Sequence, residues 1–142
     1  EVTPGNVIDH QEIENAILED CRHYRPIAIG YDPWNATQMA TSLFGKGRPV
    51  HEFIQGIKSY TAPTKELEAW LLAEKLDHGG NPVLTWMASN LKVQKDKNEN
   101  LMPTKAKSIG RIDGITALIM SIGMYLTKTA ATPYEGRGVR AA

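Results

Sequence analysis

Residues 27–55 contain the pattern that most restricts the folds open to this chain. A short apolar run at 27–31 ends at Asp32, and a turn, a helical pattern and a second, weakly alternating run at 50–55 follow it. Short apolar runs bounded by turn residues are typical of strands buried in a parallel sheet. Because parallel strands need a crossover connection, the intervening helix joins them naturally. The pattern predicts an α/β fold with a parallel strand pair.

The spacing of apolar and capping residues predicts further elements on both sides of this unit. Asp9 is expected to cap a helix that ends at Arg25-Pro26 and buries Ile13, Ala16, Ile17, Cys21 and Tyr24. A polar loop containing Pro63 should precede the next helix. The remaining predicted elements are a helix at 64–76, a helix at 83–90, a strand at 91–94 returning at 101–103, and a helix from about residue 111.

Length and composition predict one domain over residues 1–128 and a mobile tail over 129–142. Lys plus Arg and Asp plus Glu each number 16, so net charge gives no sign of a nucleic-acid partner. Such a partner would have to meet a local basic patch. The apolar stretch at 115–126 is too short to cross a bilayer. The chain opens without methionine, from which we expect a piece of a longer protein.

Two aspartates are the candidates for a metal site. Asp32 ends the first predicted strand, and Asp113 begins the last predicted helix between Gly110 and Gly114. Ligands in α/β sheets gather at the carboxyl ends of strands, and Mg²⁺ prefers hard oxygen ligands. Each aspartate also has a purely structural explanation, as a turn or cap residue at Asp32 and as a complement to the helix dipole at Asp113. Together they predict one edge of a two-metal nuclease site.

Basic residues and one histidine could contact a substrate near these carboxylates. Lys105, Lys107 and Arg111 form a cluster just ahead of Asp113, which could hold a phosphate backbone or could simply be a solvated face. His78 lies in a glycine-containing loop and could touch substrate, although a hydrogen-bonded structural role is the alternative. No phosphate-binding loop of the Gly-x-x-x-x-Gly-Lys-Ser/Thr type occurs, which argues against an ATPase in this chain.

Four ordered segments resemble the C-terminal part of tailed-phage terminase large subunits. They are 3–9 (TPGNVID), 29–36 (IGYDPWNA), 78–87 (HGGNPVLTWM) and 110–114 (GRIDG). The resemblance covers residues 2–126 and implies a ribonuclease H-like mixed sheet flanked by helices, with its opening strands absent from this chain. It also implies a nuclease that cuts concatemeric DNA with two Mg²⁺ or Mn²⁺ ions.

The same resemblance implies three acidic metal ligands, of which Asp32 and Asp113 match two. The first ligand of the family precedes residue 1, so we expect this chain alone to be weak or inactive. The implied partners are double-stranded DNA, the terminase ATPase domain, the small terminase subunit and the portal, in the host cytoplasm and without a membrane. Two alternatives stay open at this point: a non-catalytic docking module for the portal or motor domain, and another ribonuclease H-like nuclease such as a junction resolvase.

Overall fold

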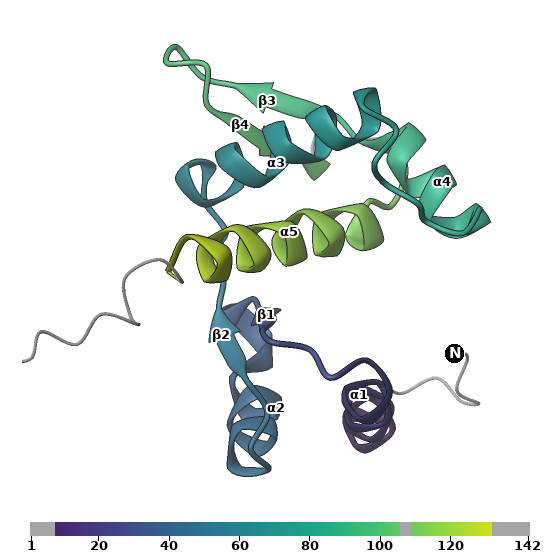
Figure 1. The fold of residues 1–142 in the computed structure, drawn as a ribbon, viewed down its shortest axis with the longest axis vertical. Helices are drawn as coiled ribbons and strands as arrows, with labels where there is room; N and C mark the ends of the chain where they lie inside the picture. The colour runs from purple at the N-terminus through teal and green to yellow at the C-terminus, as the bar shows by residue number, and fades with distance from the viewer. Residues whose placement is uncertain (1–7, 106–108, 132–142) are drawn as a thin grey trace, which may run out of the picture. The chain divides into compact units, whose positions relative to one another are not determined.

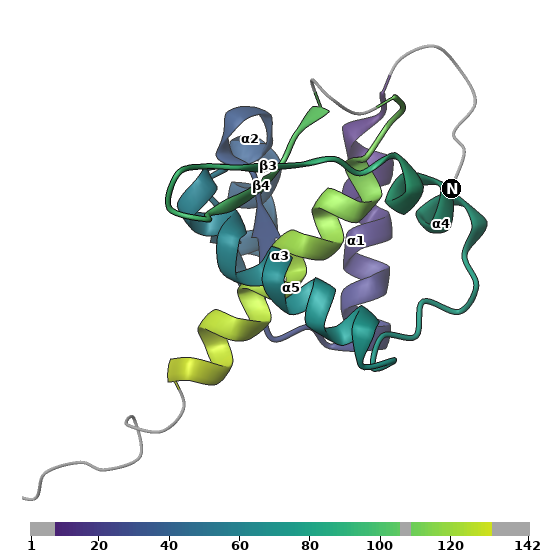
Figure 2. The same ribbon diagram turned by 90° about the horizontal axis from the view of Figure 1, so that it is seen from above.

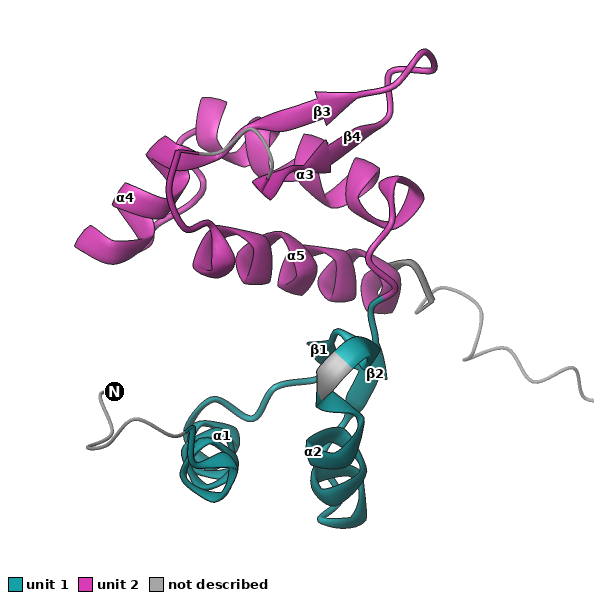
Figure 3. Cartoon of the chain, turned by 180° about the vertical axis from the view of Figure 1, so that it is seen from behind, with its two compact units in different colours: residues 1–53 teal, residues 54–142 magenta. Residues whose placement is uncertain are grey.

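The computed structural model describes residues 8–105 and 109–131, and it shows helices and short strands in the order α1-β1-α2-β2-α3-α4-β3-β4-α5 (Figure 1). The chain divides into two compact units, residues 1–53 and residues 54–142 (Figure 3). The mixed content of helices and small sheets agrees with the predicted α/β class.

The first unit contains the predicted parallel strand pair. Helix α1 (His10–Tyr24) is followed by β1 (Ile29–Tyr31), α2 (Pro33–Gly45) and β2 (Val50–Glu52). The strands pair in parallel with Tyr31 opposite Glu52. Pro33 at the first position of α2 suits a helix start, because its missing N–H would be unsatisfied there anyway. The strand–helix–strand prediction is confirmed, with shorter strands than expected.

Helix α1 begins as predicted but buries a different face. The Asp9 carboxylate accepts the N–H groups of Gln11 and Glu12 at 2.8 and 3.3 Å, and Arg25 ends the helix in the left-handed region. Cys21 is buried as expected, whereas Ile13 and Tyr24 are exposed. Glu14 is buried instead.

The burial of Glu14 has a specific cause in α2. The Ser42 hydroxyl donates to its Oε1 at 2.6 Å, and the Lys46 ammonium donates to the same oxygen. These two donors, Lys46 first, hold the pKa of Glu14 below its ordinary value. A carboxylate paired in this way can leave water without an unsatisfied charge, so it can displace apolar residues from the buried face.

In the second unit, α3 (Ile57–Leu72) lies between α5 and a strand hairpin (Figures 1 and 2). The hairpin pairs β3 (Val93–Lys95) with β4 (Leu101–Pro103) in antiparallel register. Helix α4 (Pro82–Asn90) is capped by the Asn81 side chain, which accepts the Leu84 N–H at 3.0 Å, and it packs on α5 (Asp113–Ala131). The predicted hairpin and the helix at 83–90 are confirmed.

Helix α3 begins seven residues earlier than predicted and contains Pro63 in its interior. A proline there removes a backbone hydrogen bond and normally breaks a helix. Here Tyr60, Pro63, Thr64 and Leu67 are all buried on one face. Packing of that face against the rest of the unit therefore outweighs the local preference.

The last helix supplies the centre of this core. Ile112, Ile115, Ile119 and Ile122 are each at most 4% exposed, as their three-four spacing predicts. The helix runs to Ala131, so residues 129–131 are helical rather than part of the predicted tail. The rest of that predicted tail, residues 132–142, lies outside the described residues, as does Lys107. In the part of the chain that the structure describes, no helix is long and apolar enough to cross a membrane.

Candidate functional site

Asp113 is the first residue of α5, and the packing of that helix turns it outward. Ile112 is 1% exposed and Ile115 is 4% exposed, so the helical phase between these two buried side chains directs Asp113 away from the core. Its side chain is 52% exposed. A carboxylate on the first turn also interacts favourably with the helix dipole.

Two cations face this carboxylate. The Lys105 ammonium donates to Oδ1 of Asp113 at 2.7 Å, and Nη1 of Arg111 lies 4.0 Å from Oδ2. The hydrogen bond from Lys105 is the main reason that the pKa of Asp113 is lowered, with the charges of Lys105 and Arg111 adding to it. Two residues of the predicted basic cluster therefore lie beside the predicted acidic residue, and Asp113 is held in its ionised form.

The glycines that flank Asp113 allow close packing against α4. A Cβ atom at Gly110 would lie 2.7 Å from Nδ2 of Asn90 and 3.0 Å from Cζ2 of Trp86, and one at Gly114 would lie 2.8 Å from Sδ of Met87. The Gly114 N–H donates to that same sulfur at 3.1 Å. The structure assigns the space to α4 side chains, which fix the start of α5.

His78 lies in the loop between α3 and α4 and lines a pocket of about 430 Å³. Its lining also includes Gly114, the residue after Asp113, together with Met87 and Leu118. Asp77 and Asn81 line the same pocket, and sequence reasoning had not selected them. His78 is exposed, and its pocket adjoins the start of α5.

In the first unit, Asp32 directly follows β1 and caps α2 by accepting the Trp34 N–H at 3.1 Å. The carboxyl end of the neighbouring strand carries Glu52, to which the Tyr31 hydroxyl donates at 3.3 Å. Burial, then the charge of Glu52, raises the pKa of Tyr31. Sequence reasoning missed Glu52 because the strand was predicted to continue to residue 55. With the strand ending at Glu52, carboxylates occur at the carboxyl ends of both strands.

The donor chemistry of these aspartates fits a hard divalent cation. Asp113 is ionised and half-exposed, and a carboxylate must be deprotonated and accessible to bind Mg²⁺ or Mn²⁺. In the first unit, Asp32 provides one further carboxylate that could bind such a cation. Among the described residues, no three His, Cys, Asp or Glu side chains are grouped to hold a metal ion. A shared metal site of Asp32 and Asp113 therefore stays a prediction.

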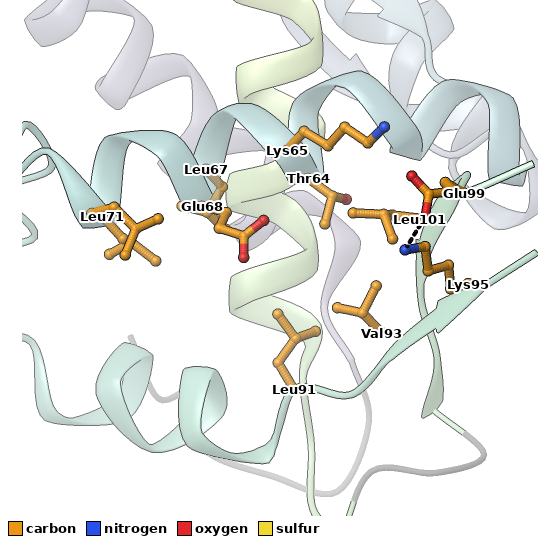
Figure 4. A pocket seen from close by; sticks show the side chains of 11 residues that line it. Thr64, Lys65, Leu67, Glu68, Leu71, Leu91, Val93, Lys95, Glu99 and Leu101 are labelled. Atoms are coloured by element: carbon orange, nitrogen blue, oxygen red, sulfur yellow. Dashed lines mark hydrogen bonds and ion pairs between the residues drawn. The ribbon is translucent and has the colours of Figure 1, made fainter.

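A separate pocket of about 800 Å³ lies between α3 and the β3–β4 hairpin (Figure 4). Leu67, Leu71, Leu91, Val93 and Leu101 are among its lining residues. At its edge, Nζ of Lys95 lies 2.7 Å from Oε1 of Glu99. None of the predicted site residues lines this pocket, so the candidate site is the region around Asp113 and, in the other unit, Asp32.

Comparison with known proteins gives concordant results. The family model of the terminase large subunit endonuclease domain matches residues 1–129. The chain is 34% identical to the terminase large subunit of Enterobacteria phage HK97 over 85% of its own length and 24% of the phage protein. It is 29% identical to protein YmfN of Escherichia coli over 98% of its length and 32% of that protein.

The fold agrees with these sequence matches. The crystal structure of the HK97 bacteriophage large terminase matches 87% of this chain and 26% of that one, with a TM-score of 0.79 and 33% identity. The chain spans 24% and 32% of the lengths of the two curated relatives. The family match, the sequence relatives and the fold together show that this chain belongs to the terminase large subunit endonuclease-domain family.

Proposed function

We propose that this chain is the metal-dependent endonuclease part of a phage DNA-packaging terminase, with a ribonuclease H-like fold. The observation that carries the proposal is the match of residues 1–129 to the endonuclease-domain family, joined to an ionised carboxylate flanked by cations at the start of α5. The substrate is double-stranded, concatemeric DNA in the host cytoplasm. The terminase ATPase domain, the small subunit and the portal are the proposed partners.

Asp32 and Asp113 are the proposed metal ligands, and each is argued from its own unit. Asp32 would hold one ion together with the further acidic ligand of the family, and Asp113 would hold the second ion. When bound, two Mg²⁺ or Mn²⁺ ions would activate a water as nucleophile and stabilise the leaving 3′ oxygen. A third acidic ligand is implied by the family resemblance, and we assign no residue of this chain to it. We therefore expect the chain by itself to cleave DNA weakly or not at all.

The cations beside Asp113 would position the DNA strand. Lys105 and Arg111 are 74% and 83% exposed, so both can reach a phosphate, and Lys107 is proposed to act with them. Contacts of this kind fix the register of the backbone without reading sequence. His78 is the proposed additional substrate contact, because its pocket adjoins the start of α5.

The experiment that tests this proposal is DNA cleavage by a full-length large subunit carrying this domain. With Mn²⁺ present, Asp32→Asn and Asp113→Asn should each reduce cleavage of linear duplex DNA by at least about 100-fold, since even indirect metal-site partners cost 10- to 100-fold. Asp20→Asn, at an exposed helical carboxylate, is the matched control and should leave the rate unchanged.

The same assay separates the competing functions. Unchanged cleavage in Asp113→Asn would reject the metal-ligand assignment and favour a docking role for this chain. A strong preference for branched over linear duplex would favour a junction resolvase. The family match to an endonuclease domain of terminases supports neither of these outcomes.

A further inference from the structure

The ion pair between Lys105 and Asp113 joins a proposed DNA contact to a proposed metal ligand. The Lys105 ammonium lies 2.7 Å from Oδ1 of Asp113, while Arg111 lies no closer than 4.0 Å to the other oxygen. Lys105 therefore makes the direct hydrogen bond, and Arg111 contributes through its charge alone. Both partners of the direct pair are well exposed, so the pair can open without burying or unburying other groups.

We propose that Lys105 is a positioning residue that couples metal binding to DNA binding. In the metal-free domain its ammonium is hydrogen-bonded to the Asp113 carboxylate. When a divalent cation binds the carboxylate, Lys105 is displaced and becomes available to a DNA phosphate. This inference rests on the proposed function, because it needs Asp113 to be a metal ligand.

Competition for the carboxylate follows from the geometry. A metal ion that uses Oδ1 must replace the hydrogen bond that Lys105 donates to the same oxygen, and two positive charges on one carboxylate repel each other. Exposed ion pairs contribute little free energy, so displacement is inexpensive. The long, flexible lysine stem lets the ammonium move to a nearby phosphate without movement of the backbone.

The proposal predicts effects of opposite sign from one substitution. Lys105→Met keeps the aliphatic stem and removes the charge. It should strengthen Mn²⁺ binding by about two- to fivefold, the range expected for removing an exposed ion-pair partner. It should weaken binding to duplex DNA in the presence of Ca²⁺, a probe for the metal-bound state, and lower the salt dependence by about one phosphate contact. A purely structural lysine would not produce both effects.

Lys95→Met is the matched control. The Lys95 ammonium also donates at 2.7 Å to a carboxylate, that of Glu99, and this exposed pair lies in the same unit. That pair does not involve Asp113, so Mn²⁺ affinity should stay at the wild-type value. Arg111→Met should raise Mn²⁺ affinity by less than Lys105→Met, because Arg111 makes no direct hydrogen bond.

The experiment is titration of the 142-residue chain with Mn²⁺, followed by the electron paramagnetic resonance signal of the free ion, together with fluorescence anisotropy of labelled duplex DNA with and without Ca²⁺. Ca²⁺ should tighten DNA binding in the wild-type chain more than in Lys105→Met, because coupling between two ligands is reciprocal. Equal Mn²⁺ affinity in wild type and Lys105→Met, or equal Ca²⁺ enhancement, would overturn the coupling.

The outcomes distinguish this inference from the proposed function. If Asp113→Asn abolishes Mn²⁺ binding while Lys105→Met leaves it unchanged, Asp113 is a metal ligand and the coupling is wrong. If Asp113→Asn leaves Mn²⁺ binding unchanged, the metal assignment itself fails, and the coupling with it. Failure of both wild type and Lys105→Met to bind Mn²⁺ at millimolar concentrations would reject both ideas for this chain.

Discussion

Gly110 lies where the segment leading to α5 crosses α4, and Gly110→Ala tests how tightly this crossing fixes the position of Asp113. The new Cβ would lie 2.7 Å from Nδ2 and 3.1 Å from Cγ of Asn90, and 3.0 Å from Cζ2 of Trp86. Both neighbours must shift to accept the new methyl group: the amide end of Asn90 and the half-exposed Trp86 ring. The substitution should therefore displace α4 relative to the segment that carries Arg111 and Asp113.

The expected cost is the difference between two effects. Overpacking of a well-packed region typically costs about 1–3 kcal/mol. Replacing glycine by alanine also reduces the entropy of the unfolded chain and returns about 0.4–1 kcal/mol where the backbone is compatible. We expect Gly110→Ala to lower the free energy of unfolding by about 1–2 kcal/mol. Gly45→Ala, at a helical glycine with no atom within 4 Å of the new Cβ, should be neutral or stabilising.

Urea unfolding followed by tryptophan fluorescence measures this cost, and a double-mutant cycle identifies its source. Asn90→Ala removes the atoms nearest to the new Cβ, and Nδ2 of Asn90 is buried without a hydrogen-bond partner among the described residues. The double variant Gly110→Ala/Asn90→Ala should therefore be more stable than the sum of the single changes by about 1 kcal/mol. Additive effects, or a Gly110→Ala chain as stable as wild type, would refute the crowded crossing and the positioning role of α4.

Two further predictions concern α5. Ile119→Ala should destabilise the second unit by about 2–5 kcal/mol because this side chain is fully buried. Ser121→Ala, at an exposed position of the same helix, should change the free energy of unfolding in urea by less than about 0.5 kcal/mol. Similar losses in both variants would contradict the assigned buried face of the helix. The lowered pKa of Asp113 means that its stabilising contribution is complete above the ordinary carboxyl pKa and is lost as pH falls through the lower folded-state value. The difference in unfolding free energy between wild type and Asp113→Asn should accordingly shrink as the pH falls from 6 to 3. At pH 6 the difference should be below about 1 kcal/mol, because the ion pair is exposed. A difference that grows on acidification would contradict the ion pair.

Local sequence patterns correctly predicted those features of the fold that are determined by residues close together in the sequence. Asp9 before an apolar-periodic segment predicted the start of α1, and the isoleucine spacing predicted the buried face of α5, because capping and helical phase are set within a few residues. The departures occur where distant residues decide. Glu14 is buried because Ser42 and Lys46 reach it from another helix. The sequence around Glu14 contains no signal from which these two partners could be predicted.

The same division applies to Pro63 and to the candidate site. Pro63 lies inside α3 because Tyr60 and Leu67 bury the same face, a tertiary gain that local propensity does not contain. The nearness of Lys105 and Arg111 to Asp113 was predicted from a separation of at most eight residues, and it is confirmed. The contact of Met87 with the first turn of α5 spans 27 residues and was not predicted. Only the folded unit shows that α4 positions Asp113.

The weakness of the Lys105–Asp113 pair is what suits it to the proposed function. A buried ion pair would cost several kcal/mol to break, because each separated charge would lack its solvation. An exposed pair contributes less than about 1 kcal/mol, so Asp113 can exchange an ammonium for a divalent cation at little cost while staying ionised. Ile112 and Ile115 keep the carboxylate outside the core during that exchange, and α4 keeps the helix start in place. A helix start fixed by packing, with a loosely held side-chain partner, is therefore the arrangement that the proposed metal ligand beside a proposed DNA-binding cation needs.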